Sequence, residues 1–501
     1  MAKIIKIPEK NGWEETQDKK FANKTELVKL PEQSGWGSLP GMGEPTVTHQ
    51  FDGINELNPF SIKDTYATRT KNLTTSSYPA LGVRGGFTPI SGISSEIDGI
   101  GVRFSELHVI AGGVWRMYKS GAWTTLKSGL STASKWSFVN FKGGFSVNSL
   151  LASNGTDKAM KYDGTSVTDL ANAPSKANFI CTHDNRVYAA SESSVHYSAL
   201  RKAEDWNTVD ESGQIVVETS DGKEITGLVA GSARLTVFKE NSIHELFGTN
   251  PKNYTMKIVT ENLGSPTGHS AQVIDGVMYF LGNDAIYKYS GGALPNSDFS
   301  VQVRETVKRI NKAYAKNSVS WSIGAIYYLA VPLDGATKPN TVLEFDTLFN
   351  TWNIWSFPYN VTAKGAVMDG YAYIGFSGGQ LMKLDGKAAN DNGVPIEWEW
   401  VSKPLTATSI AAKTRWYRLW ISAEIQAGSS LTISLSEKEE GESWVDVFTS
   451  TPAAETQSKE ILVPPNLLFH HHWVRIRLKG TGKSVVHEIT RQTRTFPFGQ
   501  G

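Results

Sequence analysis

The sequence predicts an all-β protein whose largest part is a β-propeller. Two similar stretches carry this prediction: Asp275 to Gly292 reads DGVMYFLGNDAIYKYSGG, and Asp369 to Gly386 reads DGYAYIGFSGGQLMKLDG. Each stretch combines two short strands of alternating hydrophobicity with turn residues between them and glycines at the end. A hairpin of this size cannot bury its own apolar face, so we expect repeated copies to pack together as blades.

The composition agrees with many strands separated by tight turns. The chain of 501 residues contains 46 Gly and 15 Trp, and 11% of its residues are aromatic. Its 50 Lys and Arg balance 49 Asp and Glu, so no overall field attracts it to nucleic acid or to an acidic membrane. The single cysteine, Cys181, excludes an intramolecular disulfide framework and is interpreted as a small buried hydrophobic residue.

No targeting or membrane segment is evident. The N-terminus passes from Met1 to Lys6 directly into polar residues, without the apolar core of a signal peptide. No stretch approaches the ~18 apolar residues of a membrane span. We therefore expect a soluble protein without a membrane anchor, synthesised in the cytoplasm.

Residues 1–48 contain a duplicated motif. The segment Ile4 to Trp13 recurs as Leu27 to Trp36, each copy with an aliphatic stretch, a proline, and a tryptophan after a glycine. Such a polar segment cannot build a core. We expect an extended arm that docks on a neighbouring subunit, with a disordered tail as the alternative. The expected docking residues are Ile7, Pro8, Trp13, Leu30, Pro31 and Trp36.

Residues 49–393 are predicted to form the propeller. From about residue 101 to residue 390, apolar alternation is interrupted by a turn every 8 to 12 residues or so. At roughly 45 residues per four-stranded blade, this length predicts six to eight blades, with seven preferred. We expect residues 49–100 to supply the first strands.

One segment of the propeller has helical spacing. Val303, Val307, Ile310 and Tyr314 recur at this spacing and predict a single amphipathic helix inserted between blades. The helix either packs on the side of the propeller or contacts another subunit or DNA. Its expected outward contact residues are Arg304, Lys308, Arg309 and Lys312.

Residues 394–501 are predicted to form a separate β-sandwich with a C-terminal tail. After Gly393 the strands become longer and lack the blade motif, and about seven of them fit into some 100 residues. Near the strand Trp473 to Leu478, Arg475, Arg477 and Lys479 form a basic strip, with Arg475 and Arg477 on one face of the strand. This strip is either a solvated sheet face or a contact for DNA phosphates or an acidic subunit surface.

The sequence does not predict an enzyme, a metal site or a cofactor. The carboxylates that could serve glycoside hydrolysis, such as Asp163, Asp275 and Asp369, lie next to glycines in turns, where Asp is favoured by its own backbone hydrogen bonds. In the run His470 to His472, at most two side chains could share a face, and no third ligand is evident. No nucleophile elbow or phosphate-binding glycine loop is found.

Several motifs together resemble a known family. They are Phe51 to Asn55, Lys71 to Leu73, Val83 to Gly86, Asn154 to Asp157, Lys161 to Gly164, Asn185 to Tyr188, His196 to Ser198 before Trp206, Val237 to Glu240, Phe247 to Thr249, and Trp473 to Gly482. With them the chain resembles tailed-bacteriophage β-propeller tail proteins and is similar to the packaged-DNA stabilisation or tail nozzle proteins of P22-like podoviruses. The resemblance covers roughly residues 49–495, so the arm lies outside it.

This resemblance implies a structural protein of the virion. Such a protein would form a ring, commonly a hexamer, below the portal and adaptor, extend the DNA channel and help to retain the packaged genome. The implied partners are further copies of the chain, portal or head-to-tail adaptor proteins, tail needle, spike or fibre proteins, and DNA that passes without sequence-specific binding. The alternative is a tail receptor protein that binds or cleaves glycans through a propeller face rich in Tyr and Trp.

Overall fold

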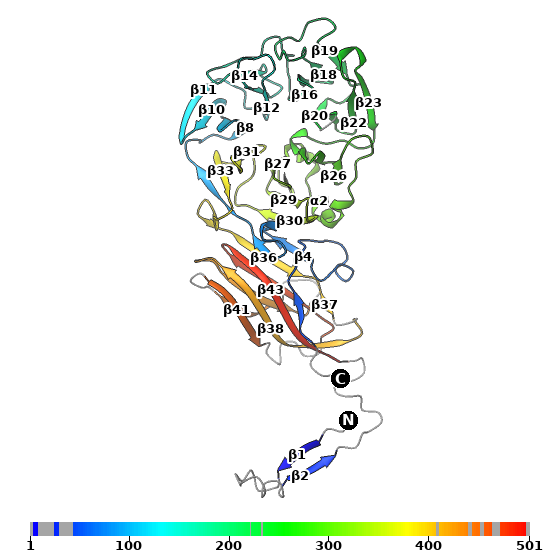
Figure 1. The fold of residues 1–501 in the computed structure, drawn as a ribbon, viewed down its shortest axis with the longest axis vertical. Coiled ribbons are helices and arrows are strands. Elements are labelled where there is room, and N and C mark those ends of the chain that lie inside the picture. Colours follow the sequence, from blue (N-terminus) through cyan, green and yellow to red (C-terminus); the bar gives the residue numbers. More distant parts are fainter. Residues whose placement is uncertain are drawn as a thin grey trace.

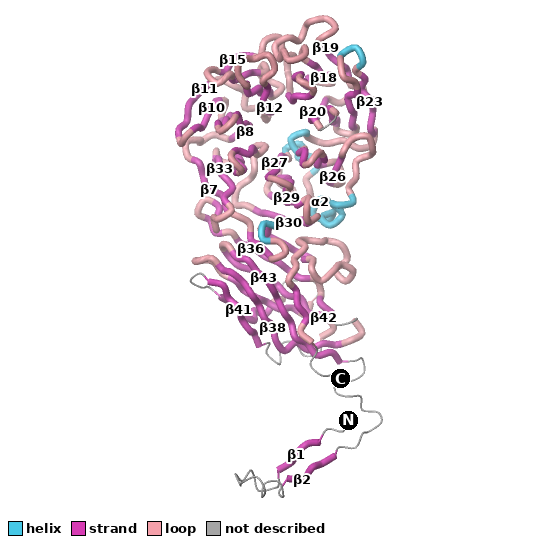
Figure 2. Tube along the Cα trace, in the orientation of Figure 1, coloured by secondary structure: helices cyan, strands magenta, loops and turns pink. Residues whose placement is uncertain are grey.

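The computed structural model describes residues 44–220, 222–231, 234–406, 410–438, 443–450 and 471–496, and the backbone alone of 4–8, 25–29 and 455–462. Two β bodies lie along the long axis of the molecule, a ring of small sheets and a sandwich of longer strands (Figure 1). Helices are few and short (Figure 2).

The ring is a seven-bladed propeller, as the sequence predicts. Among the described residues, seven antiparallel sheets follow one another in chain order. The first four blades are β8 (Ile97–Arg103), β9 (Glu106–Ala111), β10 (Val114–Lys119) and β11 (Ala122–Lys127); β12 (Ser137–Phe141), β13 (Ser149–Ser153), β14 (Met160–Tyr162) and β15 (Val167–Asp169); β16 (Phe179–His183), β17 (Arg186–Ser191), β18 (Ser194–Tyr197) and β19 (Gly213–Val216); and β20 (Ile225–Ala230), β21 (Leu235–Lys239), β22 (Ile243–Phe247) and β23 (Thr255–Thr260).

The last three blades differ from one another in construction. The fifth has three strands, β24 (Gln272–Ile274), β25 (Val277–Leu281) and β26 (Ile286–Tyr289). The sixth has β27 (Val319–Ile323), β28 (Ile326–Val331), β29 (Thr341–Asp346) and β30 (Thr351–Ser356). The seventh joins β31 (Ala366–Met368), β32 (Tyr371–Phe376) and β33 (Gln380–Asp385) to β7 (Gly86–Ile90), a strand from before the first blade, with the short pair β34 (Asn390–Asp391) and β35 (Val394–Pro395) beyond it. The ring is therefore closed by pairing the start of the propeller with its end.

Both hairpins that carried the sequence prediction are blade units. The turns before β25 and before β32 are Asp275-Gly276 and Asp369-Gly370, and all four residues have positive φ. This is the conformation of a primed two-residue hairpin turn, which Asp-Gly favours. The Asp residues therefore serve turns, as expected. Apolar clusters lie between consecutive blades all around the ring, and Cys181 is buried in the one between the third and fourth.

The second body is a β-sandwich that draws strands from both ends of the propeller. One sheet has the order β41 (Glu455–Leu462), β38 (Lys413–Ile425), β43 (Ser484–Phe496), β6 (Leu81–Val83) and β5 (Leu73–Thr74), with β3 (Thr46–Thr48) also paired to β43. The other has β4 (Ala67–Lys71), β36 (Glu397–Ser402), β42 (Trp473–Thr481), β39 (Leu431–Ser436) and β40 (Val445–Ser450), with β37 (Leu405–Thr406) beside β42. Trp398, Trp400 and Trp416 lie in the core between the sheets.

This pairing corrects the predicted domain boundary. We expected residue 49 to open the propeller, but β3 to β6 belong to the sandwich, and Phe51, Leu73 and Val83 lie in its core. The propeller is thus an insertion between two parts of the sandwich, beginning at β7. The pairings that unite those parts join residues hundreds of positions apart, such as Arg69 with Val401, and leave no local signal in the sequence.

The two bodies meet at a junction built around Arg84, a residue without solvent exposure. Its guanidinium binds both carboxylate oxygens of Asp391, at 2.6 and 2.9 Å, and donates to Asn72 Oδ1 at 3.0 Å. Arg84 lies where the chain enters the propeller and Asp391 where it leaves, so this ion pair ties the two crossings together. The sixth blade adds a bond from Trp355 Nε1 to the Leu73 carbonyl, at 2.6 Å.

Candidate functional site in the propeller channel

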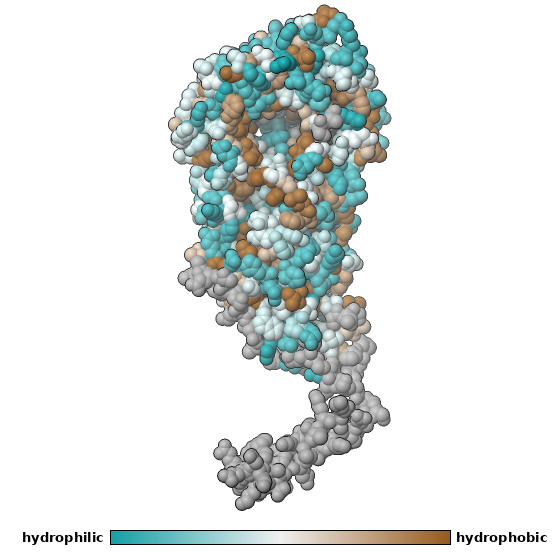
Figure 3. Space-filling view, viewed as in Figure 1, coloured by the Kyte–Doolittle hydropathy of each residue, from teal (hydrophilic) through white to brown (hydrophobic). Residues whose placement is uncertain are grey.

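The inner strands of the propeller surround a central channel, whose opening is visible in the space-filling view (Figure 3). One hollow of about 410 Å³ is lined by residues of β8, β12, β16 and β20, by the 3-10 helix Gly268–Ser270, and by residues 364–366 at the start of β31. Each of these segments comes from a different blade. The hollow is therefore a product of ring closure, and no single blade contains it.

A second hollow, of about 570 Å³, continues the channel toward the loops that connect consecutive blades. The two hollows share Phe179 and His269 as lining residues. The second one is charged, with both signs represented. Its ionisable lining residues, besides His269, are Glu96, Asp98, Lys135, Glu224 and Lys316.

Two of the lysines that line the channel each donate to a backbone carbonyl. Lys364 Nζ donates to the Ala271 oxygen at 3.1 Å, and Lys135 Nζ donates to the Asn317 oxygen. Burial lowers the pKa of Lys364 to about 8 and that of Lys135 to about 7, the latter against the opposing effect of Glu96. The protein around both amines therefore solvates their charged forms poorly.

The charges of both lysines act on His269. Its side chain is buried, and its ring packs against Phe179 with the ring centroids 5.0 Å apart. Burial, followed by the charges of Lys135 and Lys364, lowers the pKa of His269 well below its usual value. The imidazole is therefore neutral at neutral pH and offers one N–H donor and one acceptor.

Asp98 is the carboxylate most altered by the channel. Its Oδ2 atom is buried and has no hydrogen-bond partner among the described residues. Burial, with a contribution from Glu96, raises the pKa of Asp98 to about 7, while Lys338 opposes the shift. Lys338 is itself paired with Glu96 at 2.7 Å, which limits its effect on Asp98.

The predicted docking arm lies only in part within the described residues. Ile7 and Pro8 belong to β1 (Ile4–Pro8), which pairs with β2 (Thr25–Lys29) in an antiparallel hairpin. The two copies of the motif thus pair with each other, and among described strands neither has another neighbour. Trp13, Leu30, Pro31 and Trp36 fall outside the described residues.

The prediction of a single continuous amphipathic helix is wrong. The segment forms a 3-10 helix Asp298–Val303, the α-helix α2 (Arg304–Lys308) and a second 3-10 helix Lys312–Asn317. The backbone between them pairs with the sixth blade, where Asn311 N donates to the Pro332 oxygen at 2.8 Å and Ile310 bridges Leu333. This pairing requires extended backbone at Asn311, which interrupts the helix.

The side-chain directions of that segment follow the prediction more closely. Val303, Val307 and Ile310 are buried in the core between the fifth and sixth blades, while Tyr314 is exposed. The four predicted contact residues are exposed. Three of them make surface ion pairs, Arg304 and Lys308 with Glu305, and Arg309 with Asp334. Their contact with a partner remains a prediction.

The basic strip is less accessible than the sequence suggested. Arg475 and Arg477 do share the face of β42 opposite the core, but both are about 8% exposed. Their guanidinium groups stack on Trp444, 4.8 and 4.6 Å from its ring centroid. Arg477 also lies 3.8 Å from Asp446. Lys479 is partly buried on the same strand, so the strip offers little free charge to phosphates.

None of the channel residues was predicted from the sequence. Asp98, Lys135, His269 and Lys364 come from four different blades or inter-blade loops and share no spacing or motif. Within the described ranges, no group of His, Cys, Asp or Glu is placed to hold a metal ion. The helices described there are all too short or too polar to span a bilayer.

No protein-family model matches the chain, and no curated protein does either. Among solved structures it is similar to the computationally designed Ika8 protein, with 12% identity over 60% of this chain and 99% of that one, at a TM-score of 0.40. YCF48 from Cyanidioschyzon merolae shows 8% identity, coverage of 60% and 98%, and a TM-score of 0.39.

A further match is PorZ, a surface component of the type-IX secretion system of Porphyromonas gingivalis. The two chains share 15% identity, the match covers 65% of this chain and 43% of PorZ, and the TM-score is 0.38. The assignment of this chain as a propeller rests on its own strand pairing.

Proposed function

We propose that this chain is a structural subunit of a bacteriophage tail that assembles into a ring, extends the DNA channel below the portal and adaptor, and helps to retain the packaged genome. The proposal follows the resemblance of its blade and sandwich motifs to tail nozzle proteins. In this role the protein is not an enzyme and needs no cofactor. It is synthesised in the host cytoplasm and resides in the virion.

The observation that carries the proposal is the N-terminal hairpin. Its strands β1 and β2 pair only with each other among the described strands. An isolated two-stranded hairpin is marginally stable in water, so it gains stability when it packs on another surface. A neighbouring copy supplies that surface at every position of a ring, which fits an arm outside the propeller and the sandwich.

The junction between the two bodies supports the same role. Arg84 and Asp391 join the sandwich to the propeller through a buried ion pair, which favours one arrangement of the two bodies. A single arrangement suits a ring whose inner diameter must stay constant while DNA passes. The net charge of +1 suits a conduit, because a strongly basic wall would hold phosphates and slow the DNA.

Removal of the arm tests the proposal. We expect the full chain to sediment as a closed oligomer and a chain lacking residues 1–43 to sediment as a folded monomer. This deletion keeps β3, which pairs with β43, so the sandwich stays complete. The double variant Trp13→Ala and Trp36→Ala keeps the arm but removes its two tryptophan side chains, and we expect it to weaken assembly.

If the truncated chain assembles like the full chain, the arm does not dock on a neighbouring subunit. The alternative function, a tail receptor for glycans, has a different signature. If the full chain is monomeric under all conditions and retains or cleaves bacterial surface polysaccharide, the ring proposal is wrong.

A further inference from the structure

The first hollow of the channel contains positive charge that no carboxylate in its own lining balances. The described residues around the hollow of about 410 Å³ include Lys364 and His269 but neither Asp nor Glu. The Lys364 ammonium donates to a neutral acceptor, the Ala271 carbonyl. Placing an ammonium inside a protein is unfavourable unless an opposite charge accompanies it. The hollow therefore favours an anion from outside the chain.

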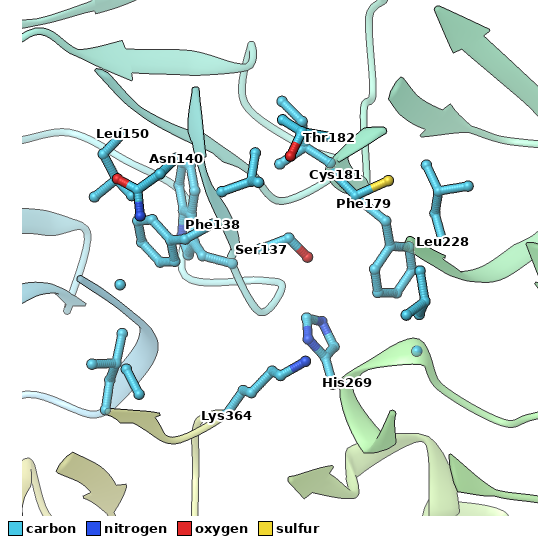
Figure 4. Close-up of a pocket in the computed structure, with 18 of the residues that line it drawn as sticks. Ser137, Phe138, Asn140, Leu150, Phe179, Cys181, Thr182, Leu228, His269 and Lys364 are labelled. Atoms are coloured by element: carbon cyan, nitrogen blue, oxygen red, sulfur yellow. The ribbon is translucent and has the colours of Figure 1, made fainter. Parts of the chain in front are cut away.

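The donors in this hollow are directed toward a common space. Figure 4 shows the Lys364 amine and the His269 ring pointing toward one another, with the Ser137 hydroxyl directed into the same opening. The three side chains come from the seventh blade, the loop before the fifth, and the second. An ammonium, an imidazole N–H and a hydroxyl together can donate to several oxygens of one tetrahedral oxyanion.

We propose that this hollow binds a small phosphate-like oxyanion, either inorganic phosphate or the phosphate group of a small organic molecule. Lys364 supplies the charge, and His269 and Ser137 supply directional hydrogen bonds. The aromatic side chains of Trp136, Phe138 and Phe179 also line the hollow and leave apolar surface for an organic group. This binding site is additional to the proposed ring function and does not depend on it.

The carboxylates of the second hollow favour binding of the anion in the first hollow, at Lys364. Glu96, Asp98 and Glu224 line that hollow and would repel a phosphate. Lys135 lies in the same region, and its charge acts on His269 in the same direction as that of Lys364. The most positive position in the channel is therefore beside His269, on the side away from the carboxylates.

Titration calorimetry of the full chain tests the proposal. Inorganic phosphate and phenyl phosphate are the two ligands, and sodium chloride at matched ionic strength is the control for general salt effects. We expect saturable binding of at least one phosphate and none of chloride. Tighter binding of phenyl phosphate indicates a phosphorylated small molecule, and tighter binding of the inorganic ion indicates free phosphate.

Three variants locate the site. Lys364→Met removes the charge at similar volume and should weaken binding at least about tenfold, the typical effect of one charged hydrogen bond. Ser137→Ala should weaken it less, and Lys387→Met, at an exposed lysine outside the channel, should leave it unchanged. Circular dichroism verifies folding, and Ser137→Ala remains informative if Lys364→Met does not fold. The proposal is wrong if neither phosphate binds, or if the folded Lys364→Met and Ser137→Ala variants bind like the unaltered chain.

Discussion

The junction and the channel both bury ionisable side chains, but they treat them in opposite ways. At the junction, Arg84 meets both oxygens of Asp391 and fills its remaining donors with the Asn72, Gly85 and Ser356 oxygens. In the channel, Lys364 and Lys135 have backbone carbonyls as their hydrogen-bond acceptors. A fully satisfied pair holds two bodies in one arrangement, whereas an ammonium without a carboxylate leaves room for a ligand.

The largest expected effect is at the junction. Arg84→Met leaves the buried Asp391 carboxylate without its cation, and we expect the free energy of unfolding to fall by about 3 to 5 kcal/mol. Urea unfolding, followed by tryptophan fluorescence, measures this change. A loss below about 1 kcal/mol would mean that the pair contributes no more than a surface ion pair.

A second test concerns Glu344, a fully buried carboxyl of the sixth blade that faces the junction. Its Oε1 atom accepts from Thr75 N at 3.3 Å, and burial raises its pKa from 4.5 to about 8. Because the folded chain holds this proton more tightly than the unfolded chain, the contribution of Glu344 to stability is greatest below pH 4.5 and falls as the pH rises to about 8.

Glu344→Gln removes this titration. Relative to the variant, the unaltered chain should lose about 1 kcal/mol of stability per pH unit between the two pKa values of Glu344. Unfolding curves at several pH values measure the difference. Parallel pH profiles of the two proteins would show that Glu344 is already ionised in the folded state.

The channel should respond differently to loss of a charge. In phosphate-free buffer, we expect Lys364→Met not to lower the free energy of unfolding, because no buried carboxylate loses its partner. The pKa of Lys364 is lowered from 10.5 to about 8, so the unaltered chain should gain stability as the pH rises between these values, and the variant should not. A loss as large as that of Arg84→Met would contradict the comparison.

The smallest effect is expected at the surface. Arg309 lies 2.6 Å from Asp334, but both side chains are more than half exposed. We expect Arg309→Ala to change stability by less than about 1 kcal/mol. Urea unfolding of this variant and of Arg84→Met in parallel compares the loss of an exposed arginine–aspartate pair with the loss of a buried one.

Local signals in the sequence predicted the blades well. Turn residues and alternating apolar residues are adjacent in the sequence, and the two predicted hairpins, β25 with β26 and β32 with β33, form as expected. The pairings that define the boundaries are non-local. The seventh blade takes β7 from nearly 300 positions away, and β4 pairs with β36 across the whole propeller. No property of Gly86 to Ile90 alone indicates that it closes a ring.

The candidate site was less predictable than the fold. Strand alternation correctly placed Arg475 and Arg477 on one face, but their burial depends on Trp444, which arrives from a neighbouring turn. The helical spacing of Val303, Val307 and Ile310 correctly predicted that these side chains are buried. It did not predict the break at Asn311, which results from backbone pairing with the sixth blade. Lys135, His269 and Lys364 come together only when the ring closes, so each appears in the sequence as an isolated residue.

Electron microscopy of the full-length protein tests the central proposal most directly. Our account predicts closed rings of uniform order, with propellers side by side around an open lumen and the N-terminal hairpin of each subunit seated on its neighbour. Isolated particles with one propeller and one sandwich, at every concentration tested, would contradict it.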